Sequence, residues 1–497
     1  MEKKAKPSGT FIRDIENLKT LFSRNKIKIF GIGAYPSTRS EIRPLIDDSE
    51  IICANQTGEF ASVSQKIKVS CFRIKNRLSS LYPVQNPEEI LSKKSVIAHI
   101  RKNSAGKRIG IYIYKPSLKI EKICRANGWI LIANRISVFD KLAGKDEACR
   151  IFQKIGKNRD FQTVPLNSLE KKLPGLFSRF GDKIVLQFPR EGGGRGTFFF
   201  RREDSKNISS EIAKKRKGSE IKNFSNRVLV NAYIKGPSLS ISGCITKSNG
   251  ILCDSLRYQL IDIAEAKKIN SAGVFCGNDW TLAKNIPAFL DKQAKKIAVL
   301  VGNVLKSEGA LGMFGIDFIR CRESDTLVPI EINPRLLGTT PVSVYVHLQK
   351  EQIPLEAFHL LEFLNIPYRK LKTLPKESFL SAHGCHLILY NQTSGRVRVG
   401  NELKGGVYAL TRASRPALKY LRPGFELSDI KNMNEFILTD GMPLKKLVYQ
   451  KNKKLLRIIS KKSLVKKSAA ELNSWGKKVV SQVRSNLKIH PLKKINR

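Results

Sequence analysis

Four side chains near residue 330 have the types and spacing of a site for a metal ion and a phosphate group. Residues 311–335 read as two apolar strands separated by a polar turn; the first carries Asp317, and the second carries Glu331, Asn333 and Arg335. Because residues at i, i+2 and i+4 of a strand share a face, the last three are expected to point the same way, and antiparallel pairing would bring Asp317 beside Glu331. Oxygen ligands suit Mg²⁺, and a guanidinium grips phosphoryl oxygens. The competing interpretation is a β-hairpin with a solvated salt bridge.

A glycine-rich loop upstream is a second candidate for phosphate binding. An apolar strand over residues 184–188 leads into Gly192, Gly193, Gly194, Arg195 and Gly196, and a further strand follows at 198–200. Glycines let backbone N–H groups approach phosphates closely, and Arg195 adds positive charge. The loop is neither a Walker A loop, since no G-x-x-x-x-G-K-[ST] occurs, nor a dinucleotide fingerprint, since it joins strand to strand. The alternative is a flexible hairpin tip.

The segments before these motifs supply a domain that could flank the site. Residues 27–36 read as a strand that runs into a Gly-x-Gly turn, and further strands follow at 49–56, 108–116 and 129–135. Alternation of strands with helical segments predicts a small parallel α/β domain over residues 27–135. Pro36 stands where a dinucleotide fingerprint would have its third glycine. The turn is therefore Rossmann-like and carries no NAD assignment.

The C-terminal part is predicted to be β-rich with a basic end. Residues 386–400 read as a hairpin that turns near Ser394, and residues 271–282 read as a loop. Beyond residue 445 basic residues are frequent, and apolar residues recur at helical spacing: Val465, Ala469, Leu472, Val479 and Val483. Such a basic amphipathic helix can lie on a membrane or on a polyanion such as RNA. The favoured interpretation is a helix that packs its apolar face on its own domain.

Composition bounds the class of protein. A chain of 497 residues is too long to fold around a single hydrophobic core, so its length suggests three or four domains. Its 90 Lys and Arg against 42 Asp and Glu give a net charge of +48, spread along the chain, which favours anionic ligands. Nine scattered cysteines without a CxxC pair, no signal peptide and no run of 18 apolar residues predict a cytoplasmic protein without a transmembrane segment. The pair His383 and His386 is not interpreted as a zinc site.

The order of these elements resembles the ATP-grasp superfamily, in particular the carbamoyl-phosphate synthetase large-chain and biotin carboxylase type. The resemblance covers about residues 135–345 clearly and implies an α/β (α+β grasp) fold. It implies an N-terminal segment (1–26), a Rossmann-like domain (27–135), a two-lobed ATP-grasp domain (136–370) and a β-rich C-terminal subdomain with a basic helical tail (371–497). Within the grasp, the glycine-loop lobe would span about 170–227 and the metal-site lobe about 228–345.

The same resemblance assigns roles to individual residues. Asp317, Glu331 and Asn333 would be the metal ligands and Arg335 the catalytic residue over the transferring phosphate. Nucleotide-binding positions would lie at the start of a helix, in the glycine loop and in a hinge strand over 228–234: Lys145, Gln187, Gly192, Gly193, Gly194, Arg195, Gly196, Val230, Asn231 and Ile234. Three features depart from the family pattern, one of them being Gly236-Pro237-Ser238 in place of a Gly-x-Glu pattern. Gln187 replaces a second lysine and contributes hydrogen bonds without charge, and Asn231 replaces a hinge glutamate.

The reaction implied by the resemblance is an ATP- and Mg²⁺-dependent ligation, with Mn²⁺ as a possible substitute. A small-molecule carboxylate would be activated as an acyl phosphate and attacked by an amine or similar nucleophile as co-substrate, so carbon–nitrogen bond formation is expected. The alternative is an ATP-binding protein with little or no turnover, in a regulatory or RNA-associated role, with the basic tail binding polyanions non-specifically. No motif identifies the acid, the nucleophile or the oligomeric state.

Overall fold

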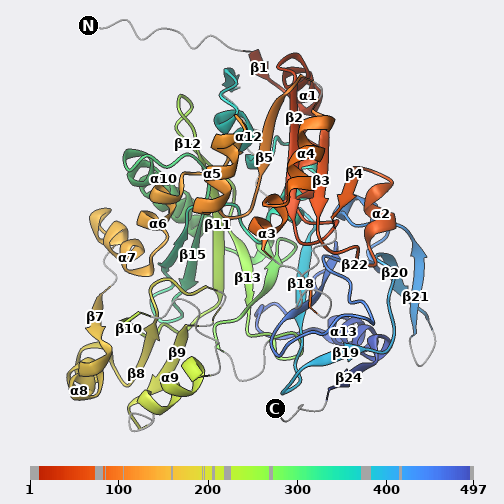
Figure 1. Cartoon of the computed structure of the whole chain (residues 1–497). Helices are drawn as coiled ribbons and strands as arrows, with labels where there is room; N and C mark the ends of the chain where they lie inside the picture. Colours follow the sequence, from red (N-terminus) through yellow and green to blue (C-terminus); the bar gives the residue numbers. More distant parts are fainter. Residues whose placement is uncertain are drawn as a thin grey trace, which may run out of the picture.

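Three main sheets and their covering helices make up the fold (Figure 1). The structure, a computed structural model, describes residues 10–72, 82–83, 86–104, 106–157, 160–192, 194, 196–203, 208–217, 225–267, 272–370, 382–412 and 417–492. Helices and strands are both abundant, so the expected α/β class is confirmed. No helix among the described residues is long and apolar enough to cross a membrane.

The N-terminal sheet has five parallel strands in the order β4-β3-β2-β5-β6. Their apolar runs are buried because a parallel sheet is covered by helices on its faces. The strands are β2 (Ile27–Gly33), β3 (Ser49–Cys53), β4 (Lys68–Cys71), β5 (Arg108–Tyr112) and β6 (Ile130–Ile132). Helices of this part are α1 (Ile15–Arg24), α2 (Phe60–Ser64), α3 (Pro87–Leu91), α4 (Lys94–Asn103) and α5 (Leu118–Ala126). This is the Rossmann-like layout that the sequence predicts.

A separate four-stranded antiparallel sheet carries the glycine loop, in the order β7-β10-β8-β9. Two short helices, α6 (Ile136–Leu142) and α7 (Lys145–Lys154), lead into it. Its elements are β7 (Phe161–Pro165), α8 (Leu169–Phe180), β8 (Lys183–Gln187), β9 (Thr197–Arg201), α9 (Ile208–Lys217) and β10 (Arg227–Ala232). Leu173 and Phe177 of α8 pack with Phe198 and Val228 in one apolar core. The loop between β8 and β9 is thus anchored on a rigid layer.

The large sheet has eleven strands, ten of them in the order β16-β15-β11-β13-β14-β18-β23-β22-β20-β21, with β12 paired to β11. Its strands are β11 (Ser238–Ile245), β12 (Ile251–Cys253), β13 (Arg257–Ile261), β14 (Phe275–Asp279), β15 (Gly312–Arg320), β16 (Leu327–Asn333), β18 (Cys385–Tyr390), β20 (Gly406–Leu410), β21 (Leu418–Arg422), β22 (Glu435–Thr439) and β23 (Lys454–Ser460). The C-terminal strands therefore continue the sheet that holds the candidate metal site.

Helices and two small strand pairs complete the fold. The helices are α10 (Ala288–Ser307), α11 (Thr340–Leu348), α12 (Leu355–Phe363) and α13 (Ser474–Leu487). The strand pairs are β1 (Thr10–Ile12) with β17 (Tyr368–Lys370), and β19 (Val397–Val399) with β24 (Ile489–Pro491). Helix α10 buries Ile297, Val301 and Leu305 in the core of the large sheet. It ends at Ser307, and Gly309 lies in the short connection to β15, which carries Asp317.

Two local predictions are wrong. Residues 271–282 were expected to form a loop, but Phe275–Asp279 is strand β14 in the middle of the large sheet. Residues 386–400 were expected to form a hairpin, but β18 pairs with β14 and β23, and β19 pairs with β24. The pairings of β14 with β18, of β18 with β23 and of β19 with β24 join segments distant in sequence, so local periodicity could not reveal them.

The basic tail is a packing element in the part that the structure describes. The helix begins later than the spacing predicts, at Ser474, and Val465 forms an isolated β-bridge with Leu472 instead. Val479 and Val483 are buried in the same core as the large sheet, together with Val465 and Leu472. The favoured interpretation of a helix packed on its own domain agrees with this burial.

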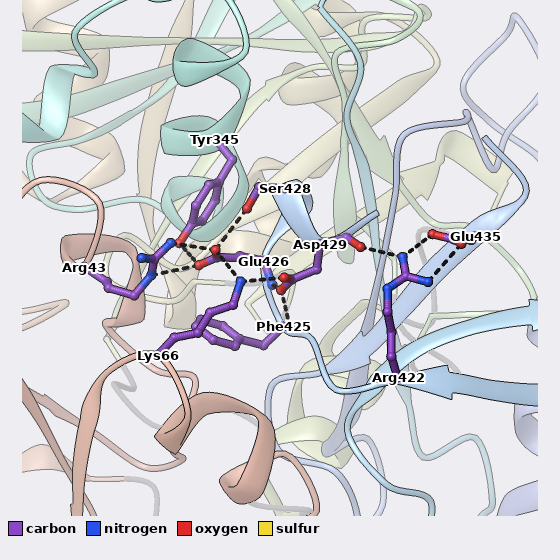
Figure 2. A network of polar contacts seen from close by, with 9 residues as sticks. All are labelled: Arg43, Lys66, Tyr345, Arg422, Phe425, Glu426, Ser428, Asp429 and Glu435. Carbon is purple, nitrogen blue, oxygen red and sulfur yellow. Dashed lines mark hydrogen bonds and ion pairs between the residues drawn. The ribbon is translucent and has the colours of Figure 1, made fainter. Parts of the chain in front are cut away.

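Ion pairs join the N-terminal part to the C-terminal strands (Figure 2). The Glu426 carboxylate, 2% exposed, accepts hydrogen bonds from the Arg43 guanidinium at 2.6 and 3.1 Å and from the Lys66 ammonium at 2.8 Å. The hydroxyl of Tyr345 donates to the same carboxylate at 2.5 Å, and Lys66 also reaches Asp429 at 2.5 Å. These contacts link three segments that are far apart in the chain.

Candidate functional site

Two strands at the edge of the large sheet bring the four predicted site residues together. β15 and β16 pair antiparallel, with Asp317 opposite Glu331 and Gly315 opposite Asn333; the register shifts just after Asp317. Asp317, Glu331, Asn333 and Arg335 all line one cavity of about 300 Å³. Strand alternation and antiparallel pairing account for the convergence, as expected for residues that share one face of a hairpin.

Hydrogen bonds orient these side chains toward one another. The Asn333 amide nitrogen donates to Oδ2 of Asp317 at 3.4 Å, and the Arg335 guanidinium donates to Oδ1 of Asn333 at 2.8 Å. Arg335 also donates to the hydroxyl of Tyr114, and its Cζ lies 4.6 Å from the centroid of that ring. These contacts hold Arg335 beside Asn333 and Tyr114, where it lines the cavity together with the two carboxylates.

The electrostatics of the carboxylate pair favour a cation. Burial, and then repulsion from Glu331, raise the pKa of Asp317 to about 7. Within the described residues no group of three or more His, Cys, Asp or Glu side chains is placed to hold a metal ion. The candidate ligand set here is two carboxylates and an amide. Such hard oxygen donors fit Mg²⁺, which proteins commonly hold through one or two carboxylates together with substrate phosphates.

The glycine loop closes over this cavity from the small sheet. Gly194 lines the cavity with φ +77°, and a Cβ there would lie 2.7 Å from the carbonyl oxygen of Gly273. A Cβ on Gly196 would lie 2.6 Å from Cβ of Glu191, so this glycine is needed for the turn itself. Gly192 is described but does not line the cavity. Gly193 and Arg195 lie outside the described residues.

Lys145 and Gln187 reach the cavity from two different elements. Lys145 is the first residue of α7, is 6% exposed, and donates through Nζ to the carbonyl oxygen of Glu191 beside the glycine loop. Gln187 ends β8 and donates to the Thr197 hydroxyl at 3.4 Å, while its own Oε1 has no hydrogen-bond partner among the described residues. Both side chains line the cavity, so a polar ligand there would meet one charged and one neutral group.

The predicted hinge strand is only partly at the site. Ile234 lines the cavity, as do its neighbours Ala232 and Tyr233. Val230 is buried in the core of the small sheet, and Asn231 is 1% exposed; neither lines the cavity. Because β10 is an inner strand, between β7 and β8, these two side chains are enclosed by the sheet and its packing. The hinge therefore lines the cavity only from the end of β10 onward, through Ala232, Tyr233 and Ile234.

Two residues of β13 belong to the site and were missed by the sequence reasoning. Arg257 and Gln259 line the cavity. Arg257 is fully buried, pairs with Asp254 at 2.7 Å and donates to the Ser242 hydroxyl at 2.6 Å. A hydrogen bond from Gln259 opposes the rise in the pKa of Asp317. The signal that could have found them is the i, i+2 spacing of two polar residues in the otherwise apolar strand over 257–261.

Comparisons with known proteins agree with this geometry. Residues 170–339 match the ATP-grasp domain family. A search of curated protein sequences gives no match. Biotin carboxylase from Campylobacter jejuni, solved as a β,γ-ATP complex, superposes with a TM-score of 0.55 at 14% identity, covering 94% of this chain and 92% of that one.

Two further solved structures have the same fold. The biotin carboxylase domain of Hydrogenobacter thermophilus 2-oxoglutarate carboxylase, with MgADP, ADP and bicarbonate, gives a TM-score of 0.54 at 14% identity and covers 87% of this chain and 85% of that chain. Phosphoribosylamine–glycine ligase from Thermotoga maritima gives 0.52 at 12% identity and covers 93% and 97%. At this low sequence identity, the superpositions establish the fold alone.

Proposed function

Because this chain has the ATP-grasp fold, we propose that it is an ATP- and Mg²⁺-dependent ligase that activates a substrate carboxylate as an acyl phosphate. Transfer of the γ-phosphoryl group to the carboxylate releases ADP. An amine or similar nucleophile then attacks the acyl carbon, and inorganic phosphate and a proton leave as the expected carbon–nitrogen bond forms. One observation carries the proposal: Asp317, Glu331, Asn333 and Arg335 converge on a cavity that the glycine loop and Lys145 also line. The complexes of similar folds with MgADP and ATP support the choice of nucleotide and metal.

Each group in the cavity has a role in such a reaction. Asp317, Glu331 and Asn333 would hold Mg²⁺, and the ion would supply charge neutralisation for the phosphates. Arg335 stabilises negative charge on the transferring group and on the acyl phosphate. Lys145 and the glycine loop hold the nucleotide, and the closed loop keeps water away from the acyl phosphate. Since phosphoryl transfer needs positioning and charge neutralisation, no nucleophilic side chain is required.

ADP formation with a panel of carboxylic acids and amines tests the proposal. The expected result is ADP release that requires both Mg²⁺ and an acid, with Mn²⁺ tested as a replacement for Mg²⁺. Release of ADP without an acid would indicate an ATPase. ATP binding without ADP release under any combination would favour the second candidate, a nucleotide-binding protein in a regulatory or RNA-associated role. The neutral Gln187 in the cavity is the observation that favours this candidate.

Replacing Lys145 by Met tests the nucleotide assignment. The Lys145 ammonium is buried beside the glycine loop, where it would meet a phosphate oxygen. Loss of a hydrogen bond to a charged group is expected to raise the Kd for ATP about tenfold to a hundredfold, measured by calorimetry. Lys141→Met, on the neighbouring helix α6 and in an exposed ion pair with Glu308, is the matched control. An unchanged Kd in Lys145→Met would remove this residue from the nucleotide site.

Replacing Gly194 by Ala tests the closed position of the loop. The positive φ and the approach of the Gly273 carbonyl oxygen both oppose a Cβ at this position, so the loop is expected to open. The KM for ATP should then rise about tenfold with little change in Tm. Gly175→Ala, in helix α8 of the same lobe, where a Cβ meets no atom within 4 Å, is the control. Equal KM values for the two variants would contradict the closed loop.

A further inference from the structure

A second and larger cavity lies beside the nucleotide cavity. It measures about 780 Å³ and lies between the N-terminal sheet and the C-terminal strands β22 and β23. Tyr114 and Gly338 line both cavities, so the two adjoin at these residues. A volume of this size matches pockets that enclose a whole small molecule rather than a single small ion. The reacting group of a molecule bound here would lie next to Arg335, which contacts Tyr114.

The wall of this second cavity is largely apolar. Its apolar side chains come from both sides of the domain boundary, among them Ile32, Leu118, Ile120, Ile136, Phe425 and Ile459. Phe425 of the opposite wall belongs to the segment that Arg43 and Lys66 hold through Glu426 and Asp429, and Tyr345 of α11 donates to the same Glu426 (Figure 2). These ion pairs fix the distance between the two walls. The cavity is therefore shaped before a ligand arrives, which favours affinity for a molecule with an apolar body.

Arg39 is a buried cation in this wall, and Glu41 is its ion-pair partner. Its side chain is 5% exposed, and its Nε and Nη1 have no hydrogen-bond partner within the described part of the chain. The nearest carboxylate oxygen, Oε1 of Glu41, is 3.4 Å from Nη1. A carboxylate that reached the guanidinium from the cavity would add a charge-assisted hydrogen bond.

The position of Arg39 places its guanidinium at the junction of the two cavities. Its Cζ lies 5.5 Å from the centroid of the Tyr114 ring, against which Arg335 also packs. Asp440 of the same wall accepts from Arg457 at 2.9 Å and from Lys454 at 2.6 Å. Arg39 and Arg335 thus both contact the ring of Tyr114, which lines both cavities. A guanidinium is suited to a planar carboxylate.

Gly31 and Gly33, in the last part of β2, make room for the loop that carries Arg39. A Cβ on Gly31 would lie 2.7 Å from Cβ of Arg39, and a Cβ on Gly33 would lie 2.4 Å from Cβ of Thr38. The two glycines therefore make room for the loop that folds back over the strand. Arg39 itself has φ +72°, a conformation that is strained for a residue other than glycine and that often marks a functional position.

We propose that the second cavity binds the acid substrate, a carboxylic acid with an extended apolar body, and that Arg39 binds its carboxylate at the junction with the nucleotide cavity. The proposal rests on the ligase function proposed above and names the class of acid. The apolar body lies between Ile120 and Phe425, and the carboxylate faces Arg335 and the nucleotide. Arg39 is accordingly a determinant of specificity for acids over neutral analogues.

Binding measurements on the full chain test this without turnover. Phenylbutanoate and decanoate are titrated by calorimetry in the presence of Mg²⁺ and a non-hydrolysable ATP analogue, each beside its primary amide and beside acetate. Both long acids are expected to bind at least tenfold more tightly than their amides and than acetate, because a charge-assisted pair adds to apolar burial. Arg39→Gln should remove the preference for acid over amide, and Arg39→Lys should retain part of it.

Two further variants separate the roles of charge and shape. Arg101→Gln, an exposed arginine of α4 that does not line the cavity, should leave all affinities unchanged. Ala34→Phe, which fills the cavity from the N-terminal wall, should weaken the long acids and leave the ATP analogue bound as before. Tm values for each variant show that the fold is kept.

The outcomes distinguish this proposal from the ligase proposal. Acids that bind no better than their amides, or not at all, overturn the assignment of Arg39, as does an Arg39→Gln variant that keeps the preference. If ADP forms with an acid independently of Arg39, the ligase function stands and the acid site lies elsewhere. If acids bind through Arg39 and no acid supports ADP formation, the site stands and the ligase function fails.

Discussion

Glu331→Gln is expected to lower Mg²⁺-dependent ADP formation about a thousandfold while the protein keeps its fold. Glu331 stands directly opposite Asp317 in the β15–β16 pair, and both line the nucleotide cavity. A glutamine keeps the shape and one oxygen but removes the charge that balances Mg²⁺. Because charge neutralisation is the main contribution of the protein to phosphoryl transfer, the loss should fall on kcat more than on KM for ATP.

The control for this variant lies in the same hairpin. Glu323→Gln, an exposed residue in the turn between β15 and β16, removes the same charge outside the cavity and should leave turnover unchanged. The measurement is ADP release against Mg²⁺ concentration, with circular dichroism and Tm as checks of folding. ADP release by Glu331→Gln at the rate of the unmodified protein would refute the metal assignment.

Glu426→Ala is expected to destabilise the protein by about 3–5 kcal/mol. Glu426 is 2% exposed and accepts from Arg43, Lys66 and Tyr345 (Figure 2). Removing the carboxylate takes the acceptor from the Arg43 guanidinium and from the buried Tyr345 hydroxyl, and leaves Lys66 with Asp429 alone. Losing one partner of such a network costs more than the pair itself contributes. The free energy of unfolding is measured in urea at neutral pH, and Glu471→Ala, in an exposed pair with Lys466, is the control with little expected change.

The same carboxylate predicts the direction of the pH dependence. Burial tends to raise the pKa of Glu426, but Arg43, Lys66 and Tyr345 outweigh it, so the pKa lies below its usual value. A lowered pKa in the folded state means that the stabilisation is present above the unfolded value, about 4.3, and is lost as the pH falls below it. Glu426→Gln should therefore lose less stability between pH 6 and pH 3 than the unmodified protein does, about 1–2 kcal/mol less. Equal losses would contradict the assignment.

Local sequence patterns identified the parts of the site that lie on single strands or loops. Polar residues at 331, 333 and 335 stand out in an apolar strand because side chains alternate between faces, and the hairpin with Asp317 needs only a short turn. The glycine loop is visible because several glycines in succession have few other uses. The predictions of the hairpin and of the glycine loop thus depend on neighbours within about twenty residues, as in the hairpin that spans residues 312–333.

Pairings between distant segments were not visible in the same way. Strand β14 has a glycine in its middle, Gly277, and resembled a loop; it becomes a strand because β13 and β18 pair with it on either side. Arg257 looks like an ordinary charged residue until Asp254 and Ser242 enclose it. Likewise Val230 and Asn231 were placed at the site by position along the chain, while the enclosing strands remove them from it.

The sequence by itself determined the fold class, the hairpin with its two carboxylates, and the glycine loop, because backbone geometry and side-chain alternation are local properties. Only the tertiary structure decided which surfaces face each other: that Arg39 and Arg335 meet at Tyr114, and that two cavities adjoin there. Those residues follow β2, β5 and β16 in the chain, and their proximity follows from packing one sheet against another. Burial and long-range pairing energies set that arrangement, and no short stretch of sequence contains them.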